Sequence, residues 1–338
     1  MMKSLWVYIL FLLIAILSCS KDSKINVDEE ILSIPKGFPS INFPVGNEFT
    51  KERWLLGKKL FYEKKLSKSN LISCGSCHKP ELAFGDNVSL SDGDNLTNGT
   101  SNSPTLINMA YNPYFTRAGG VPTLEMQILV PIQEHNEFNH NIVDITNELN
   151  ADITYHNDAL KCYNRPFDPF VLTRAIANFE RSLISGNSSY DKHFFQNKKN
   201  ALTANEISGL NLFMGNKTNC SECHSGFNFT NYSFENNGLY ENYADSGRMR
   251  LTKIESDRGL FKVPTLRNIE YTAPYMHDGS IQTLAQVVEH YNNGGKSFNN
   301  KSSFIKPLFL SNQEKQDLVS FLKTLTDNQF LNNNKFKQ

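Results

Sequence analysis

Two copies of one short motif constrain this chain more than any other feature of its sequence. The pattern Cys-x-x-Cys-His occurs once at Cys74, Cys77 and His78, and again at Cys220, Cys223 and His224. Two thiols one helical turn apart can each add to a vinyl group of a porphyrin, and the adjacent His can then bind the iron. The motifs therefore predict two covalently attached haem c groups, with His78 and His224 as the proximal ligands of the two irons.

Other uses of paired cysteines explain the pattern less well. A zinc site needs four ligands with matched spacing. A thioredoxin-like Cys-x-x-Cys belongs to a βαβ setting. Neither alternative accounts for a His directly after both pairs. The remaining Cys162 is interpreted as a small, buried apolar residue, which is the usual role of an isolated Cys.

The N-terminus predicts an exported protein. Lys3 precedes an uncharged apolar run over residues 5–17, which is too short for a comfortable membrane span and suits a signal peptide. The run ends in Ile-Leu-Ser before Cys19, which resembles a bacterial lipobox. We expect a signal over 1–18, lipidation of Cys19, a tether over 19–45 and a membrane-anchored lipoprotein on the periplasmic side. Ordinary secretion with an incidental Cys19 is the alternative.

The charge balance argues against nucleic acid as a partner. Lys and Arg together number 34, as do Asp and Glu, so the formal net charge is zero. Binding to phosphates needs a basic surplus. A local patch for docking a small redox protein is still allowed.

The expected fold class is mainly α, with two cytochrome c-like haem domains and long loops. A Gly-x-x-Leu-Phe pattern precedes each haem motif, at residues 57–61 and 209–213, and suggests a duplication. Apolar spacing predicts helices over 52–61 and 171–183, and Ser311 with Glu314 forms a capping-box signature. Residues rich in Gly, Asn and Ser predict loops over 85–103 and 233–257. The domains are predicted at 46–200 and 201–332.

Several segments together resemble the bacterial di-haem cytochrome c peroxidase and MauG family, from about residue 45 to residue 330. The first half contributes the segments 57–61, 72–78, 102–106, 124–127 and 131–137. The second half contributes Phe-Lys-Val-Pro-Thr-Leu-Arg-Asn at 261–268 and Ala-Pro-Tyr-Met-His-Asp-Gly at 273–279. The combination is far more specific than the haem motifs alone.

The resemblance implies a role for each haem and for several residues. The haem on His78 would be peroxidatic and the haem on His224 would transfer electrons. Glu137 falls at the distal acid–base position, and Gln127 at a pocket glutamine; a carboxylate there can take a proton from peroxide and return it to the leaving oxygen. Asn102, Thr272 and Pro274 match positions that hold a calcium ion between the domains, the last two through their backbone carbonyls, a set of oxygen ligands that suits Ca²⁺.

Three departures from the family pattern bear on activity. The loop 79–103 contains no His, so the first iron is expected to be five-coordinate at rest unless His135 or His140 intrudes. Arg117 stands where the family often has a Trp between the haems, so electrons would take another route. Tyr291 stands where the peroxidases proper place an axial Met. MauG-like members carry an axial Tyr at this position. A phenolate stabilises higher iron oxidation states, whereas Met raises the potential.

Two alternatives remain open at the second haem and for the function. Met276 could bind the second iron in place of Tyr291, and His277 is read as a neighbour of a propionate. The main functional expectation is a peroxidase that reduces hydrogen peroxide to water with electrons from a small cytochrome c or cupredoxin. A MauG-like oxidase that modifies a partner protein, and a non-catalytic electron relay, are the other two. The family resemblance also allows a homodimer.

Overall fold

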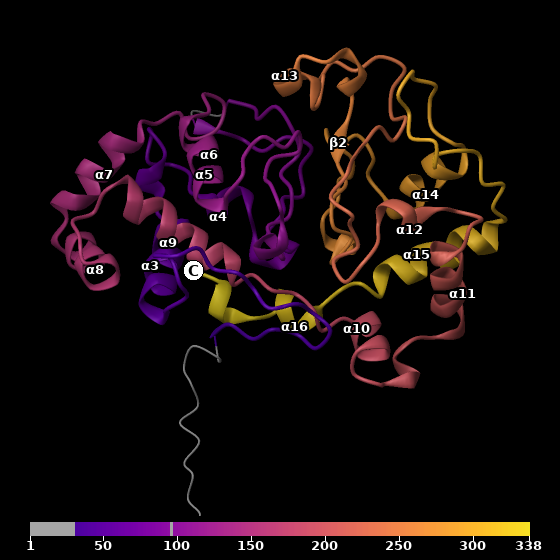
Figure 1. Ribbon diagram of the computed structural model, residues 1–338, viewed down its shortest axis with the longest axis horizontal. Helices are drawn as coiled ribbons and strands as arrows, with labels where there is room; N and C mark the ends of the chain where they lie inside the picture. Colours follow the sequence, from indigo (N-terminus) through magenta and orange to yellow (C-terminus); the bar gives the residue numbers. More distant parts are fainter. Residues whose placement is uncertain (1–30, 95–96) are drawn as a thin grey trace, which may run out of the picture.

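The computed structural model describes residues 31–94 and 97–338, which form a mainly helical fold with one small sheet. The predicted signal, Cys19 and the first part of the tether lie outside the described residues. Within the described residues, no helix is both long enough and apolar enough to cross a membrane. Figure 1 shows two lobes, one built from the first half of the chain and the other from the second half.

The first lobe is built on the packing of helix α3 (Lys51–Phe61) against helix α9 (Pro169–Arg181). Thr50 caps α3 and Asp168 caps α9, each by accepting a hydrogen bond from a backbone N–H of the first turn. Apolar side chains of both helices fill the core. The other helices of this lobe are α4 (Cys74–Cys77), α5 (Leu124–Gln127), α6 (Leu129–Gln133), α7 (Ile142–Ala151) and α8 (Ile153–Tyr163).

The second lobe repeats this plan with helix α11 (Ala204–Met214) packed against helix α15 (Asn312–Lys323). The predicted capping box of α15 is confirmed, with the Ser311 side chain accepting from Glu314 N. The other helices are α10 (Ser189–Phe194), α12 (Cys220–Cys223), α13 (Met249–Thr252) and α14 (Leu284–Asn292). Strands β1 (Phe234–Glu235) and β2 (Phe261–Lys262) pair antiparallel. Short 3₁₀ turns complete both lobes: η1 (Lys64–Leu66), η2 (Pro80–Leu82), η4 (Met109–Tyr111), η5 (Lys199–Ala201), η6 (Glu255–Asp257) and η7 (Ile269–Tyr271).

The repeated Gly-x-x-Leu-Phe pattern marks the same helix crossing in both lobes. A Cβ added to Gly57 would lie 1.9 Å from the carbonyl oxygen of Ala175, and one added to Gly209 would lie 1.9 Å from that of Asp317. Only glycine lets the two backbones approach so closely. The Phe that ends each pattern also packs in the same way: the ring centroids of Phe61 and Phe179, and of Phe213 and Phe321, are 5.0 Å apart. The crossing supports the predicted duplication.

The end of the chain returns from the second lobe to the first. After α15 it forms α16 (Asn328–Leu331) and the 3₁₀ turn η8 (Asn334–Phe336), and its terminus lies near α3 in Figure 1. Phe330 and Phe336 belong to the core of the first lobe, and the Tyr62 hydroxyl donates to the Phe336 carbonyl at 2.6 Å. The two cores therefore share the C-terminal segment.

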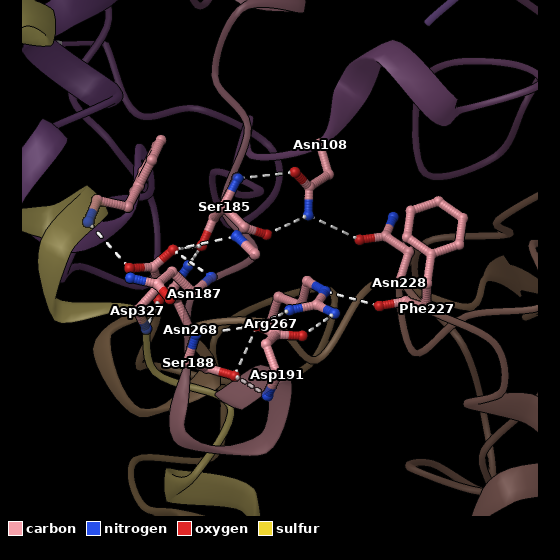
Figure 2. A network of polar contacts seen from close by, with 12 residues as sticks. Asn108, Ser185, Asn187, Ser188, Asp191, Phe227, Asn228, Arg267, Asn268 and Asp327 are labelled. Carbon is pink, nitrogen blue, oxygen red and sulfur yellow. Dashed lines mark hydrogen bonds and ion pairs between the residues drawn. The ribbon is translucent and has the colours of Figure 1, made fainter. Parts of the chain in front are cut away.

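A buried polar network joins the lobes (Figure 2). The Arg267 guanidinium donates to both oxygens of Asp191, at 2.9 Å each. Asp327, just before α16, accepts from the backbone N–H groups of Gly186 at 3.0 Å and Asn187 at 2.9 Å. Asn108 of the first lobe donates to Asn228 of the second at 3.0 Å. The network thus fixes the linker between α9 and α10 against both lobes.

The predicted elements were found with small differences. The helix predicted at 52–61 is α3, and the one predicted at 171–183 is α9, which begins earlier because Asp168 and Pro169 start it. No helix or strand is described between η2 and η4, in agreement with the loop predicted at 85–103. The prediction of a loop over 233–257 was partly wrong, because this stretch contains β1, which pairs with the distant β2, and the short helix α13.

Candidate active site

The first haem motif presents a neutral, oriented histidine. The Nδ1 atom of His78 lies 2.8 Å from the carbonyl oxygen of Phe84. A carbonyl only accepts, so Nδ1 carries the hydrogen and Nε2 keeps its lone pair for a metal. Burial lowers the pKa of His78, and the hydrogen bond to the Phe84 carbonyl opposes that effect. The neutral imidazole is the form that binds iron.

The second motif repeats this arrangement. The Nδ1 atom of His224 lies 3.1 Å from the carbonyl oxygen of Phe229, and burial lowers the pKa of His224. The rings of Phe84 and Phe229 both pack within the aromatic core of their own lobe. Each core therefore fixes the carbonyl that orients its histidine.

The cysteines of both motifs fit covalent haem. All four are free thiols with accessible surface, and burial raises the pKa of each of them: Cys74, Cys77, Cys220 and Cys223. Two free thiols one helical turn apart and a neutral imidazole next to them are what a haem c requires. The residues present therefore fit one haem at each motif.

Glu137 lies on the side of the first motif. Its charge raises the pKa of both Cys74 and Cys77. Burial, with a smaller effect of Glu134, raises the pKa of Glu137 itself, although the residue keeps an exposed surface. The Glu137 carbonyl accepts from Asp94 N at 2.7 Å, which holds this loop against the loop that follows the motif. The fold thus places a carboxyl whose pKa is raised near the cysteines of the first motif.

Gln127 is the last residue of α5, which Thr123 caps. Its side-chain oxygen is buried and has no hydrogen-bond partner within the described residues. Buried polar atoms are seldom left without a partner, and such an atom points to a missing ligand or water. This property agrees with the expectation that Gln127 faces a binding pocket.

Both candidate ligands of the second iron meet at one residue, Asn237. Burial raises the pKa of Tyr291 to about 12, and a side-chain hydrogen bond with Asn237 opposes this effect. The charges of Cys220 and Cys223 raise the same pKa further. Tyr291 therefore lies beside the second motif. The Asn237 amide also donates to the sulfur of Met276 at 3.2 Å. His277, by contrast, stacks on Phe261 with centroids 4.1 Å apart.

The sequence interpretation missed Glu180 and Asn237. Glu180 lies on α9 and is only 5% exposed; burial raises its pKa to about 8, and its charge raises the pKa of Cys74. The sequence did offer a signal for Glu180, which is an acidic residue beside the apolar positions of the helix predicted at 171–183. Asn237 lies in an Asn-rich stretch that offered none. Cys162, expected to be buried, is only partly buried and packs against the edge of the first core.

The residues expected to bind calcium do not fit that ion. The Arg117 guanidinium donates to the carbonyl oxygen of Asn102 at 2.7 Å and to its side-chain oxygen at 3.2 Å. Amide and backbone carbonyl oxygens are ordinary calcium ligands. What argues against the ion here is the positive guanidinium that already donates to both oxygens of Asn102.

Comparison with known proteins identifies similar chains. The family described as di-haem cytochrome c peroxidase matches residues 51–200. The methylamine utilization protein MauG of Methylorubrum extorquens is 33% identical over 289 residues, covering 85% of this chain and 81% of that protein. The cytochrome c551 peroxidase of Nitrosomonas europaea is 36% identical over 280 residues, covering 81% and 80%.

A solved structure shows the same likeness over nearly the whole chain. The crystal structure of a MauG-like protein associated with microbial copper homeostasis superposes with a TM-score of 0.85 at 31% identity, covering 90% of this chain and 98% of that one. The chain belongs to the di-haem cytochrome c peroxidase and MauG family, which implies two haem c groups.

Proposed function

We propose that this protein reduces hydrogen peroxide to water at the first haem site, with electrons from a small cytochrome c or cupredoxin that enter through the second. The observation that supports this most is the position of Glu137 beside the first motif, with its pKa raised by burial. The absence of His from the loop 79–103 supports an accessible first iron. A relative named for its cytochrome c551 peroxidase activity supports a cytochrome as donor.

The side chains of this site would manage the protons of the reaction. When bound, the haem supplies an iron that binds peroxide and passes it two electrons. Glu137 takes a proton from one peroxide oxygen and delivers it to the other as the O–O bond breaks. Two protons from solvent, and two electrons from the donor that replace those given by the haem, balance the reduction of one peroxide to two water molecules. The free side-chain oxygen of Gln127 accepts a hydrogen bond that orients the peroxide.

Substitution of Glu137 tests this proposal. Glu137→Gln removes the base and keeps the shape of the side chain, so kcat is expected to fall about 10²–10⁴-fold, the usual contribution of a general acid–base group. The matched control is Glu134→Gln, which removes a neighbouring exposed carboxylate. Both variants should keep two haems per chain by pyridine haemochrome assay. Full peroxide turnover by haem-loaded Glu137→Gln would reject the role of Glu137.

A MauG-like oxidase that modifies a partner protein is the second candidate, and the position of Tyr291 beside the second motif favours it. The spectrum of the purified protein after one equivalent of peroxide distinguishes the two. A peroxidase should return to its resting spectrum quickly once donor is present. An altered spectrum that persists for minutes and decays on modifying a protein would favour the oxidase. A resting EPR spectrum without a high-spin component, together with no turnover, would favour the electron relay.

We also propose that the protein is exported and anchored on the periplasmic side through lipidated Cys19. The apolar run before Cys19 supports this. Mass spectrometry of the protein purified from membranes should show a chain that begins at Cys19 with a lipid mass. Cys19→Ser should release the protein in soluble form. Retention of residues 1–18 on the mature chain would reject the proposal.

A further inference from the structure

Arg117 lies at the contact between the lobes. Its guanidinium donates from Nη2 to the Asn102 carbonyl oxygen at 2.7 Å and to the Asn102 side-chain oxygen at 3.2 Å. Its Nε donates to the same carbonyl at 3.2 Å. The planar guanidinium thus holds both oxygens of one residue, which a Lys ammonium cannot do with the same geometry.

Two backbone hydrogen bonds cross between the lobes on either side of this contact. Asn102 N–H of the first lobe donates to the His277 carbonyl of the second at 3.1 Å. Lys262 N–H of the second lobe donates to the Arg117 carbonyl of the first at 2.7 Å. Asn102 and Lys262 each lie two residues before a Pro-Thr-Leu segment, so they are equivalent positions of the duplication. The Arg117 side chain therefore holds Asn102, whose backbone makes one of the two crossing bonds, while the Arg117 carbonyl makes the other.

The charges around Arg117 suit a resident cation. Burial lowers the pKa of Arg117 to about 10, and Asp278 and Asp245 of the second lobe oppose that effect. No carboxylate within the described residues forms an ion pair with Arg117 at 4 Å or less. The two Asp side chains thus provide a negative field at longer range. A positive group at this point is stabilised by the two Asp carboxylates and can donate hydrogen bonds to the Asn102 oxygens.

We propose that the Arg117 guanidinium is the resident cation at the contact between the lobes, that it takes the Asn102 oxygens a divalent ion would need, and that the interface therefore requires no calcium. The resemblance to the family led us to expect Asn102, Thr272 and Pro274 as calcium ligands, and the donor set argues against this. The proposal does not depend on which reaction the haems perform.

Calcium dependence of the wild-type haem-loaded protein is the first test. We expect less than about 0.1 calcium per chain by elemental analysis after gel filtration, and the same Tm in EDTA and in millimolar CaCl₂. The resting EPR spectrum should also be the same in both buffers. One tightly held calcium per chain, or a Tm that falls by several degrees in EDTA, would overturn the proposal without any variant.

Variants of Arg117 are the second test. Arg117→Ala should lower the Tm by about 3–8 °C, as expected for loss of one or two net hydrogen-bonded contacts of a charged group. Arg117→Lys should not restore the wild-type Tm, because the ammonium lacks the planar fork. The control is Arg250→Ala, which removes an exposed Arg of the second lobe.

Hydrogen exchange separates the role at the interface from a general loss of stability. In Arg117→Ala, the amides of Asn102 and Lys262 should exchange faster than in the wild type, while the amides of α3 and α11 keep their protection. If Arg117→Ala matches the wild type in both Tm and exchange at these two amides, Arg117 does not join the lobes. The measured calcium content decides the matter if the variant does not fold.

Discussion

Arg267 and Asp191 form an ion pair within the second lobe, beside the linker that joins the lobes, in which neither side chain is exposed. The two hydrogen bonds are 2.9 Å each, and the Arg267 Nε also donates to the Phe227 carbonyl at 2.7 Å. Asp191 additionally accepts from the Ser188 backbone and hydroxyl. The charge on each partner is thus fully compensated, and the loss of one partner leaves a buried charge without compensation (Figure 2).

The first prediction concerns this pair. Arg267→Met should lower the free energy of unfolding by about 3–5 kcal/mol, because it leaves the Asp191 carboxylate buried and unpaired. Urea unfolding of the haem-loaded protein measures it. The control Arg258→Ala breaks an exposed pair with Glu255 and should change the stability far less, because water and salt screen exposed charges. A similar small cost for both variants would show that the buried Arg267–Asp191 pair is not important for stability.

The second prediction concerns the two helix crossings. Gly57→Ala and Gly209→Ala should each destabilise the protein by about 3 kcal/mol, because the new Cβ would overlap a backbone carbonyl that cannot move aside. Gly99→Ala serves as control, since its Cβ would meet no atom closer than 3.3 Å. Thermal unfolding measures the three variants. If Gly57→Ala and Gly209→Ala have the same Tm as the control, the helices can move apart at these crossings without loss of stability.

The sequence predicted what depends on local patterns and missed what depends on distant packing. The haem motifs, α3 and the capping box of Ser311 are encoded within a few residues each, and their elements were found in the structure. The placement of Glu180 beside Cys74 and the return of Phe336 to the first core join segments far apart in the chain. Arg117 could be recognised as a replaced Trp, but its contact with Asn102 needed the folded structure.

The third prediction is a pH dependence that comes from Glu180. Its folded pKa is raised to about 8 from the ordinary value of 4.5, so the folded state binds its proton more tightly than the unfolded state does. The stability that this proton contributes is complete below pH 4.5 and is lost as the pH rises towards 8. The loss is on the order of a few kcal/mol. Urea unfolding at pH 5 and pH 8 should show a smaller difference in Glu180→Gln than in the wild type. An equal difference in both proteins would exclude Glu180 as the cause.

The last prediction distinguishes the two candidate ligands of the second iron. Tyr291 and Met276 both reach Asn237, so their positions allow either. We expect Tyr291→Phe to raise the midpoint potential of the second haem by on the order of 100 mV, since an anionic phenolate stabilises the oxidised iron and axial ligands tune haem over roughly 0.8 V. Met276→Leu should leave that potential and the low-spin EPR signal unchanged, as should the exposed control Tyr271→Phe. If Met276→Leu alters both and Tyr291→Phe alters neither, the sulfur is the ligand and the MauG-like reading of this site is lost.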